Sequence, residues 1–392
     1  MENRWLSGLF LLALLALPVL GLVAGPLYAA LVFGLGGVLA LHDGIRERRL
    51  PEVDRRLLAL ALAFAALCWA SVLWSVAPGH SRHAALQITV ILAGALIVLG
   101  NRLPDERTCH TLFRALPFAI GLGVGVLCLD RALHQGWASW FSVDISKYSR
   151  GLDYLVLIAW PVLAWAVAGR RRGTAAAVAG LVVIALAAGI STTGVLALVA
   201  GVLLFGLALV LKDATAPVLF GALAPLAIAL PFILRLFATS RRALDPYIKD
   251  SGLHRLEIWD YMSSRIMERP LSGWGVSGAT AVPIHPEELA SYRWVGPGGI
   301  YPHNQWLELW LETGLPGVVL ALAFVALVLF QIRRALPPAL RPFAFAAFGS
   351  ALTISLFNFE FTTDSWWAAL AASALLFKVL TRLEGAVGGE PR

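Results

Sequence analysis

Polar side chains open the apolar stretch YPHNQWLELWLETGLPG at residues 301–317. Pro302 suits the first position of a helix, so we expect His303 and Asn304 to lie at a helix N-terminus. The helix dipole there lowers the pKa of a histidine and favours the neutral imidazole that a general base requires. The pattern therefore predicts a candidate general base.

Two carboxylates extend this polar cluster. Glu308 and Glu312 follow Asn304 at spacings of four residues, which places all three on one face of a helix. Gly314 and Pro316 should then break the helix, so that its first part forms a separate piece above the final spans. Ionisable residues at membrane depth favour a function. The alternative is an interfacial helix whose polar face meets water.

A second stretch, SGLHRLEIWDYMSSRIMERP at residues 251–270, has the pattern of an amphipathic helix. Ser251 is a candidate N-cap and Pro270 a stop signal. Such a helix would lie on the membrane surface or over a cavity. At helical spacing, one stripe of it carries Arg255, Trp259, Met262 and Ile266.

Arg255 lies in the first turns of that helix, where the dipole disfavours a cation unless an anion is bound nearby. The alternative is a solvated arginine paired with Glu257 or Asp260. Two other loops carry arginines: WSVAPGHSRH holds Arg82, and KYSRGLDYL holds Arg150. Each alone could cap a span, but together with Arg255 they would suit a phosphate or diphosphate.

Other kinds of site find little support. GWGVSG at residues 273–278 fits the spacing G-x-G-x-x-G, but it follows a helix and a proline instead of a strand, so we interpret it as a turn. No acidic pair or His/Asp cluster has the spacing of a metal site, and we expect neither metal nor cofactor. The three cysteines are expected to be packing residues.

The elements that must position these side chains are membrane helices. The chain has 392 residues, 59% hydrophobic and 14% charged, with a mean hydropathy of +0.76, which excludes a soluble domain. Windows of roughly 20 apolar residues predict an all-α polytopic protein with about 12 transmembrane helices. They fall near 5–23, 25–42, 57–76, 84–100, 112–130, 152–169, 174–191, 194–211, 216–237, 315–332, 342–358 and 365–380. We expect the first to be a span and not a cleaved signal peptide.

Basic residues set the expected orientation. With both termini in the cytoplasm, the short inside loops hold most of the lysines and arginines, as the positive-inside rule requires. The basic balance is thus a topology signal, and we expect no nucleic-acid partner. Residues 1–237 would hold nine spans, 238–314 a large periplasmic loop with short helices and the catalytic segment, and 315–392 three spans and a cytoplasmic tail.

The segments SGLHRLEIW, RPLSGWG and PHNQWLELWLETGLPG together resemble the bacterial O-antigen ligase and O-antigen polymerase superfamily. YSRGLDYLVLIAWP resembles the Arg-Gly span of its ligase-like members. The resemblance covers residues 70–333. It implies a metal-independent glycosyltransferase with a GT-C-like membrane fold, acting at the periplasmic face of the bacterial inner membrane on a glycan carried by undecaprenyl diphosphate.

The resemblance also implies residue roles. His303 matches the family histidine proposed as the base, and Arg255 matches the arginine that holds the donor diphosphate. The family often has another arginine where this chain has Thr193, in STTG. Arg150 or Arg82 would have to supply that charge. Asn304, Trp259 and Glu312 are candidates for supporting roles.

Three functions follow from these expectations. The first is an O-antigen ligase that joins the polysaccharide to lipid A-core. The second is an O-antigen or exopolysaccharide polymerase with the same lipid-linked donor. A polysaccharide transporter or flippase is a distant third, because the chain shows no repeated halves and its polar groups gather at one face.

Overall fold

The computed structural model describes residues 4–133, 145–189, 191–239, 250–283, 287, 292 and 301–388. Every regular element in this part of the chain is helical. The elements are α1 (Arg4–Val23), α2 (Gly25–Arg46), α3 (Arg55–Ser71), α4 (Pro78–Gly100), α5 (Glu106–Ala132), α7 (Ile145–Ala168), α8 (Arg172–Gly189), α9 (Thr192–Leu211), η1 (Lys212–Ala214), α10 (Thr215–Thr239), α12 (Asp250–Glu268), η2 (Ala279–Ala281), α14 (Gln305–Ala335), α15 (Arg341–Phe357) and α16 (Asp364–Gly388).

By length and composition, nine helices of the described residues could cross a membrane. One of these runs, Thr192–Leu236, covers both α9 and α10, while α3 and α15 have only 17 residues each. The all-α polytopic architecture is therefore confirmed, whereas the number of about 12 spans stays a prediction. The polar STTG separates α8 from α9 as expected, and Ser191 accepts a hydrogen bond from Gly194 N as the N-cap of α9.

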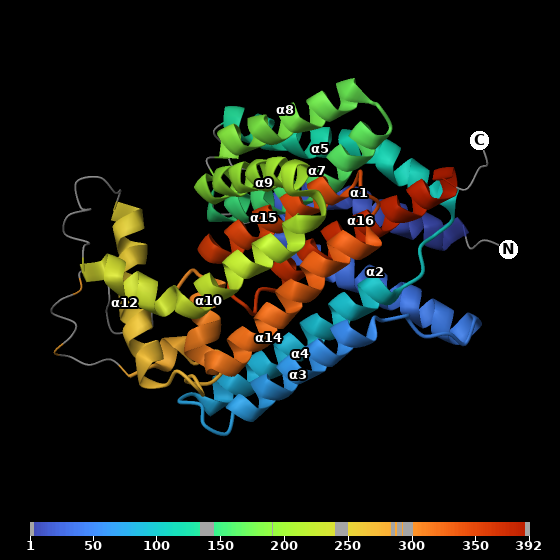
Figure 1. The fold of residues 1–392 in the computed structure, drawn as a ribbon. Helices are drawn as coiled ribbons and strands as arrows, with labels where there is room; N and C mark the ends of the chain where they lie inside the picture. Colours follow the sequence, from blue (N-terminus) through green and yellow to red (C-terminus); the bar gives the residue numbers. More distant parts are fainter. Residues whose placement is uncertain are drawn as a thin grey trace.

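The long helices pack side by side, and α12 lies at one end of the bundle (Figure 1). The start of α1 and the end of α16 lie at the opposite end. The central helices are α7, with 83% of its span buried, and α16, with 67%. Other spans expose large apolar side chains such as Leu203 and Val210, as lipid-facing helices do. Gly151 lets α7 touch the backbone of α1, because a Cβ there would overlap the carbonyl of Gly21.

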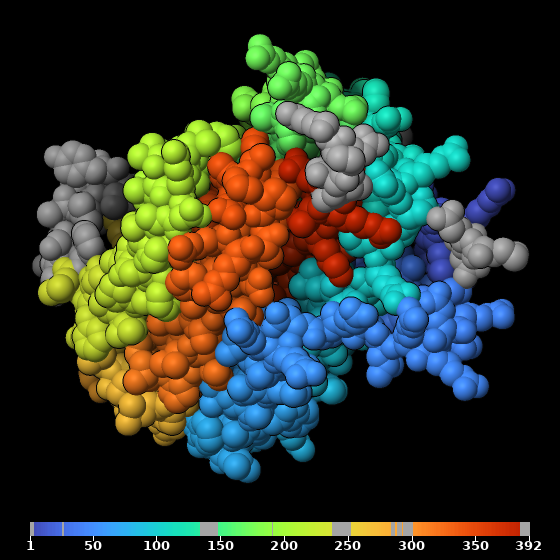
Figure 2. Space-filling model, turned by 45° about the vertical axis from the view of Figure 1, so that its right-hand side comes forward, coloured from blue at the N-terminus to red at the C-terminus, as the bar shows by residue number. Residues whose placement is uncertain are grey.

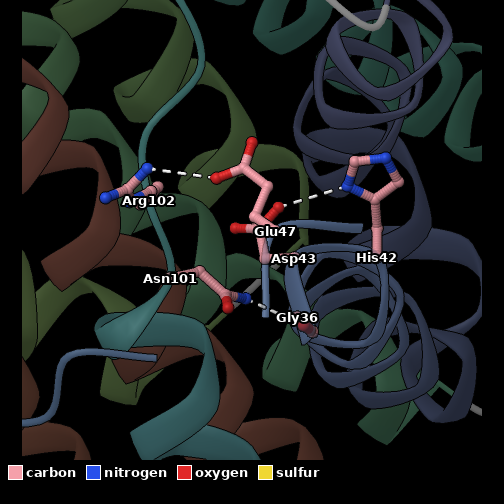
Figure 3. A network of polar contacts seen from close by, with 6 residues as sticks. All are labelled: Gly36, His42, Asp43, Glu47, Asn101 and Arg102. Atoms are coloured by element: carbon pink, nitrogen blue, oxygen red, sulfur yellow. Dashed lines mark hydrogen bonds and ion pairs between the residues drawn. The ribbon is translucent and has the colours of Figure 1, made fainter. Parts of the chain in front are cut away.

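At the end remote from α12, polar contacts join α2 to the residues that follow α4 (Figure 3). Asn101 Nδ2 donates to Gly36 O at 2.8 Å, and Arg102 pairs with Glu47 at 3.2 Å. Lys378 of α16 donates to Leu99 O and Asn101 O, at 2.7 and 2.8 Å. A lysine at a helix C-terminus satisfies carbonyls that lack a partner within the helix. These contacts hold the C-terminal parts of α2, α4 and α16 together.

A large apolar cavity of about 910 Å³ lies between α3, α4, α14, α15 and α16. Figure 2 shows the surface of α14 beside that of α3 and α4, with α16 set back between them. The lining extends from Gln305 and Trp306 at one end to Lys378 and Arg382 at the other. The cavity therefore runs along the bundle from the first turn of α14 to the polar contacts of the opposite end.

Candidate active site

The amphipathic helix exists as α12, and its predicted stripe faces inward. Met262 and Ile266 are each 1% exposed, while Arg255 and Trp259 are partly buried. The N-cap prediction was wrong: α12 already includes Asp250, so Ser251 lies within the helix. Residues 240–249, 284–286, 288–291 and 293–300 of the predicted outer loop lie outside the described residues.

The beginning of α14 also differs from the prediction. The first helical residue is Gln305, and Asn304 is the N-cap, whose side chain accepts hydrogen bonds from Trp306 N at 3.0 Å and Leu307 N at 3.1 Å. Pro302 is therefore not the first helical residue. An asparagine side chain satisfies free N–H groups at a helix start, which a proline cannot do. Asn304 thus has a structural role here, and its side chain is committed to the helix.

His303 precedes this cap in a turn with a φ of +49°. Such a conformation costs about 1–3 kcal/mol for a residue other than glycine, and surrounding contacts must hold it. Trp259 supplies one of them, because its Nε1 donates to the carbonyl of Pro302 at 2.6 Å. Asn304 fixes the other side of the turn. Two flanking contacts thus present the imidazole from a strained position.

The surroundings of His303 favour a neutral imidazole. Burial, followed by the charges of Arg255, His254 and Arg150, lowers its pKa to about 4. The predicted direction is confirmed, but the cause is burial and nearby cations, since the histidine lies outside the helix. The ring of Tyr301 meets the imidazole edge to face, with centroids 4.7 Å apart.

Arg255 is a partly buried cation whose pKa is lowered by burial. Within the described part of the chain it forms no ion pair, so the alternative of a pair with Glu257 or Asp260 does not describe this structure. Asp260 instead accepts a hydrogen bond from Tyr292 at 3.0 Å. A half-buried guanidinium without a carboxylate is suited to bind an anion.

Arg150 and Arg82 have different surroundings. Arg150 lies near the N-terminal end of α7, is exposed, and has its Cζ 5.8 Å from the ring centroid of Phe359. Its neighbour Ser149 bonds Ser191 at 3.1 Å, so Arg150 lies next to the helix start that carries Thr193. Arg82 is exposed in the first turns of α4. The structure thus brings Arg255 and Arg150 to His303, and Arg82 is not among the charges that lower the histidine pKa.

The loop between α15 and α16, residues 358–363, contacts both α7 and α14. No sequence pattern had singled it out. Asn358 Nδ2 donates to Asp153 on α7. Further along, Glu360 O accepts from Gln305 Nε2 at 3.1 Å, and Phe361 N donates to Glu308 at 2.9 Å. Glu308, seen in the sequence only as part of a polar stripe, therefore anchors this loop to α14.

The predicted break in α14 is confirmed. Gly314 has a φ of +64° and a ψ of −161° within the helix. The carbonyls of Leu311 and Glu312 accept hydrogen bonds from Trp274 N and Gly275 N, at 2.8 and 2.9 Å. Backbone groups freed by a proline and a glycine must find other partners, and the GWGVSG turn provides them.

Glu312 is enclosed by the same turn. It is 4% exposed and accepts backbone hydrogen bonds from Ser277 and Ala279. Its contacts therefore hold the turn against α14, which is a structural role. GWGVSG is confirmed as a turn, with positive φ at Gly273 and Gly275.

Comparisons with known proteins give the family that the chain resembles. The family model O-Antigen ligase matches residues 175–322. A provisionally named polysaccharide ligase of Rickettsia felis is 24% identical over 82% of this chain and 80% of its own length. Another, of Rickettsia bellii, is 26% identical over 82% of this chain and 79% of its own length. These matches confirm the similarity to the O-antigen ligase superfamily.

Proposed function

We propose that the chain is an O-antigen ligase, a glycosyltransferase that moves a polysaccharide from undecaprenyl diphosphate to lipid A-core at the periplasmic face of the inner membrane. The observation that carries the proposal is the arrangement around His303. A neutral imidazole lies among Arg255, His254 and Arg150, and neither arginine is paired with a carboxylate within the described part of the chain. The similarity to polysaccharide ligases supports the same reaction class.

The chemistry requires two kinds of group, and both are present. The acceptor hydroxyl oxygen forms a bond to the anomeric carbon while the bond from that carbon to the diphosphate oxygen breaks. The diphosphate leaves with the electron pair, and Arg255 and Arg150 stabilise its charge. The acceptor proton passes to the imidazole of His303. Arginines thus supply the positive charge for the leaving group, and the proposed reaction is metal-independent.

The large apolar cavity supports a lipid-linked substrate. Its lining begins at Gln305 and Trp306, directly after the turn that holds His303. A long isoprenoid tail could lie along this apolar lining, with its diphosphate head at the outer end beside Arg255 and Arg150. Apolar surface of this extent is suited to a hydrocarbon chain.

The same proposal includes the finer topology. We propose twelve crossings in a GT-C-like arrangement, with both termini cytoplasmic and α12 periplasmic. The position of α12 at the end opposite the start of α1 and the end of α16 supports this orientation (Figure 1). Residues 1–237 and 315–392 would then hold the spans, and 238–314 the catalytic segment.

A deletion strain distinguishes the ligase from the alternatives. Loss of a ligase should leave long polyprenyl-linked chains in the membrane and a bare lipid A-core. Loss of a polymerase should give a core capped by a single repeat unit, and that result would favour the polymerase with the same donor. Failure to deliver lipid-linked glycan to the periplasm would favour a transporter or flippase.

A further inference from the structure

We infer that Asp153 is a positioning residue, which ties the helix of Arg150 to the start of α14, beside His303, through Asn358. The inference rests on the proposed function, since that function gives Arg150 and His303 their roles. The connecting element is the loop of residues 358–363 between α15 and α16. Its contacts reach both helices.

Asp153 is a carboxylate enclosed by protein, with an exposed fraction of 0%. Its Oδ2 accepts the hydrogen bond from Asn358 Nδ2. Its Oδ1 is buried without a hydrogen-bond partner among the described residues and lies near Gly194, where a Cβ would come within 3.4 Å of it. Burying an incompletely bonded carboxylate is costly, so stability alone does not account for an acid at this position.

Arg150 lies one turn before Asp153 on α7, so the same helix carries both side chains. On its other side the guanidinium faces the ring of Phe359. That ring is fully buried and stacks on Tyr154 and Trp366, with centroid distances of 5.5 and 4.9 Å. The packed ring of Phe359, next to Asn358 in the chain, therefore limits where the guanidinium of Arg150 lies.

The next two loop residues make the contacts with α14. Glu360 O accepts from Gln305, and Phe361 N donates to Glu308. Gln305 is the first residue of α14, two positions after His303. Four consecutive residues, 358–361, thus contact first the helix that carries Arg150 and then the helix that begins two residues after His303.

This connection should fix the separation between the guanidinium and the imidazole. Transfer requires the leaving diphosphate and the acceptor hydroxyl on opposite sides of one carbon. A misplacement of about 1 Å can cost about a hundredfold in rate. Asp153 would therefore influence catalysis without touching either substrate.

The test is Asn358→Ala, with Ser350→Ala as the matched control. Ser350 also joins α7 to α15, through a hydrogen bond from Trp160 Nε1 at 2.9 Å, but it lies about two turns before the loop in α15. We expect Asn358→Ala to lower kcat by roughly ten- to a hundredfold and Ser350→Ala to leave it near wild type. The acid limb of the pH profile should also shift upward in Asn358→Ala, because Arg150 would no longer act fully on His303 together with Arg255 and His254. Equal kcat and pH profiles in the two variants would overturn the inference.

An exchange of partners provides a second measurement. Asn358→Asp alone places two acidic side chains face to face, without the amide donor, and should lower the rate as Asn358→Ala does. Asp153→Asn combined with Asn358→Asp restores a pair of one amide and one acid and should recover much of the rate. A double variant no better than Asn358→Asp would contradict the inference. Hydrogen exchange at residues 301–308, measured without substrate, should accelerate in Asn358→Ala and not in Ser350→Ala. Failure of the wild type to transfer a glycan from polyprenyl diphosphate would instead overturn the proposed function. Unchanged hydrogen exchange at residues 301–308 in Asn358→Ala would overturn the inferred link between Asp153 and the start of α14.

Discussion

The imidazole of His303 and the ring of Tyr301 meet nearly at right angles, with an interplanar angle of 83°. Burial, and then the carboxylate of Glu308, raises the pKa of Tyr301 far above its usual range, so the phenol stays neutral. A neutral ring packed against the imidazole limits its rotation without competing for its proton. Tyr301 thus helps to orient the imidazole that we propose as the base.

The first prediction concerns His303 itself. His303→Ala and His303→Gln should each lower transfer by about a hundredfold to ten-thousandfold, because neither side chain can take the acceptor proton. The measurement is transfer by purified enzyme, with donor binding and protein level determined in parallel. His83→Gln, an exposed histidine on α4, is the control and should remain active. An active His303→Gln enzyme would show that the histidine orients a substrate and does not deprotonate it.

The pH dependence should reflect the lowered pKa of His303. Since protonation sets in only as pH falls towards about 4, kcat/KM should be insensitive to imidazole titration from about pH 6 to about pH 8. Arg255→Gln removes the cation that, after burial, contributes most to the lowered pKa of His303. The pKa of His303 should therefore rise, and the acid limb should move towards neutral pH. An acid limb near pH 6.5 in the wild type would contradict the described surroundings.

The arginines should differ in their response to lysine. Arg255→Lys and Arg150→Lys keep the charge but lose the planar fork that grips a diphosphate, so both should raise KM for the donor and lower kcat. Arg114→Lys, exposed on α5, is the control. Arg82→Ala tests the remaining predicted cation: a normal rate would exclude Arg82 from the diphosphate site. Normal transfer by both lysine variants at 255 and 150 would show that generic charge is sufficient.

Trp259 should support catalysis through the backbone of Pro302. Trp259→Phe keeps an aromatic ring and removes the hydrogen bond of 2.6 Å, leaving a partly buried carbonyl without its donor, at a cost of about 1–3 kcal/mol. We expect kcat to fall while donor KM changes little. Trp69→Phe, which also loses one indole hydrogen bond, should stay near wild type. Equal rates for the two variants would remove Trp259 from the support of His303.

The orientation can be tested with impermeant thiol reagents. Glu287→Cys should react in intact spheroplasts, and Arg172→Cys should react only after permeabilisation. Both positions are exposed. Cys68 and Cys109 are buried, and the partly exposed Cys128 should be replaced by serine to keep background labelling low. The reverse pattern would place the site in the cytoplasm and overturn the proposed donor.

Local patterns predicted the helices well, because a membrane span leaves a long apolar signal and a break leaves glycine and proline. The start of α14 was misplaced because two rules competed. Pro302 favours a first helical position, but Asn304 is a strong N-cap two residues later, and the cap determined the boundary. His303 therefore lies before the helix and not within it. The prediction of a neutral imidazole was nevertheless correct in direction.

The assembly of the site could not be predicted from local sequence. Arg150, Arg255 and His303 lie on separate elements, and the contacts that join them pass through the loop at residues 358–363. No periodicity in the sequence indicates that Asn358 contacts Asp153, which lies 205 residues earlier in the chain. Long-range contacts of this kind follow from helix packing, and a single sequence does not reveal them.

The break at Gly314 has a mechanical consequence. The part of α14 before Gly314 shares backbone hydrogen bonds with the GWGVSG turn, and the helix is interrupted before the part that follows. Membranes of different thickness are accommodated by tilting of their spans, and a hinge at this depth would absorb such tilt before it reaches the turn of His303. The enzyme should therefore keep a similar turnover in short-chain and long-chain phosphatidylcholine vesicles. The part of α14 next to His303 is held by the GWGVSG turn, and only the part after Gly314 would have to follow the lipid.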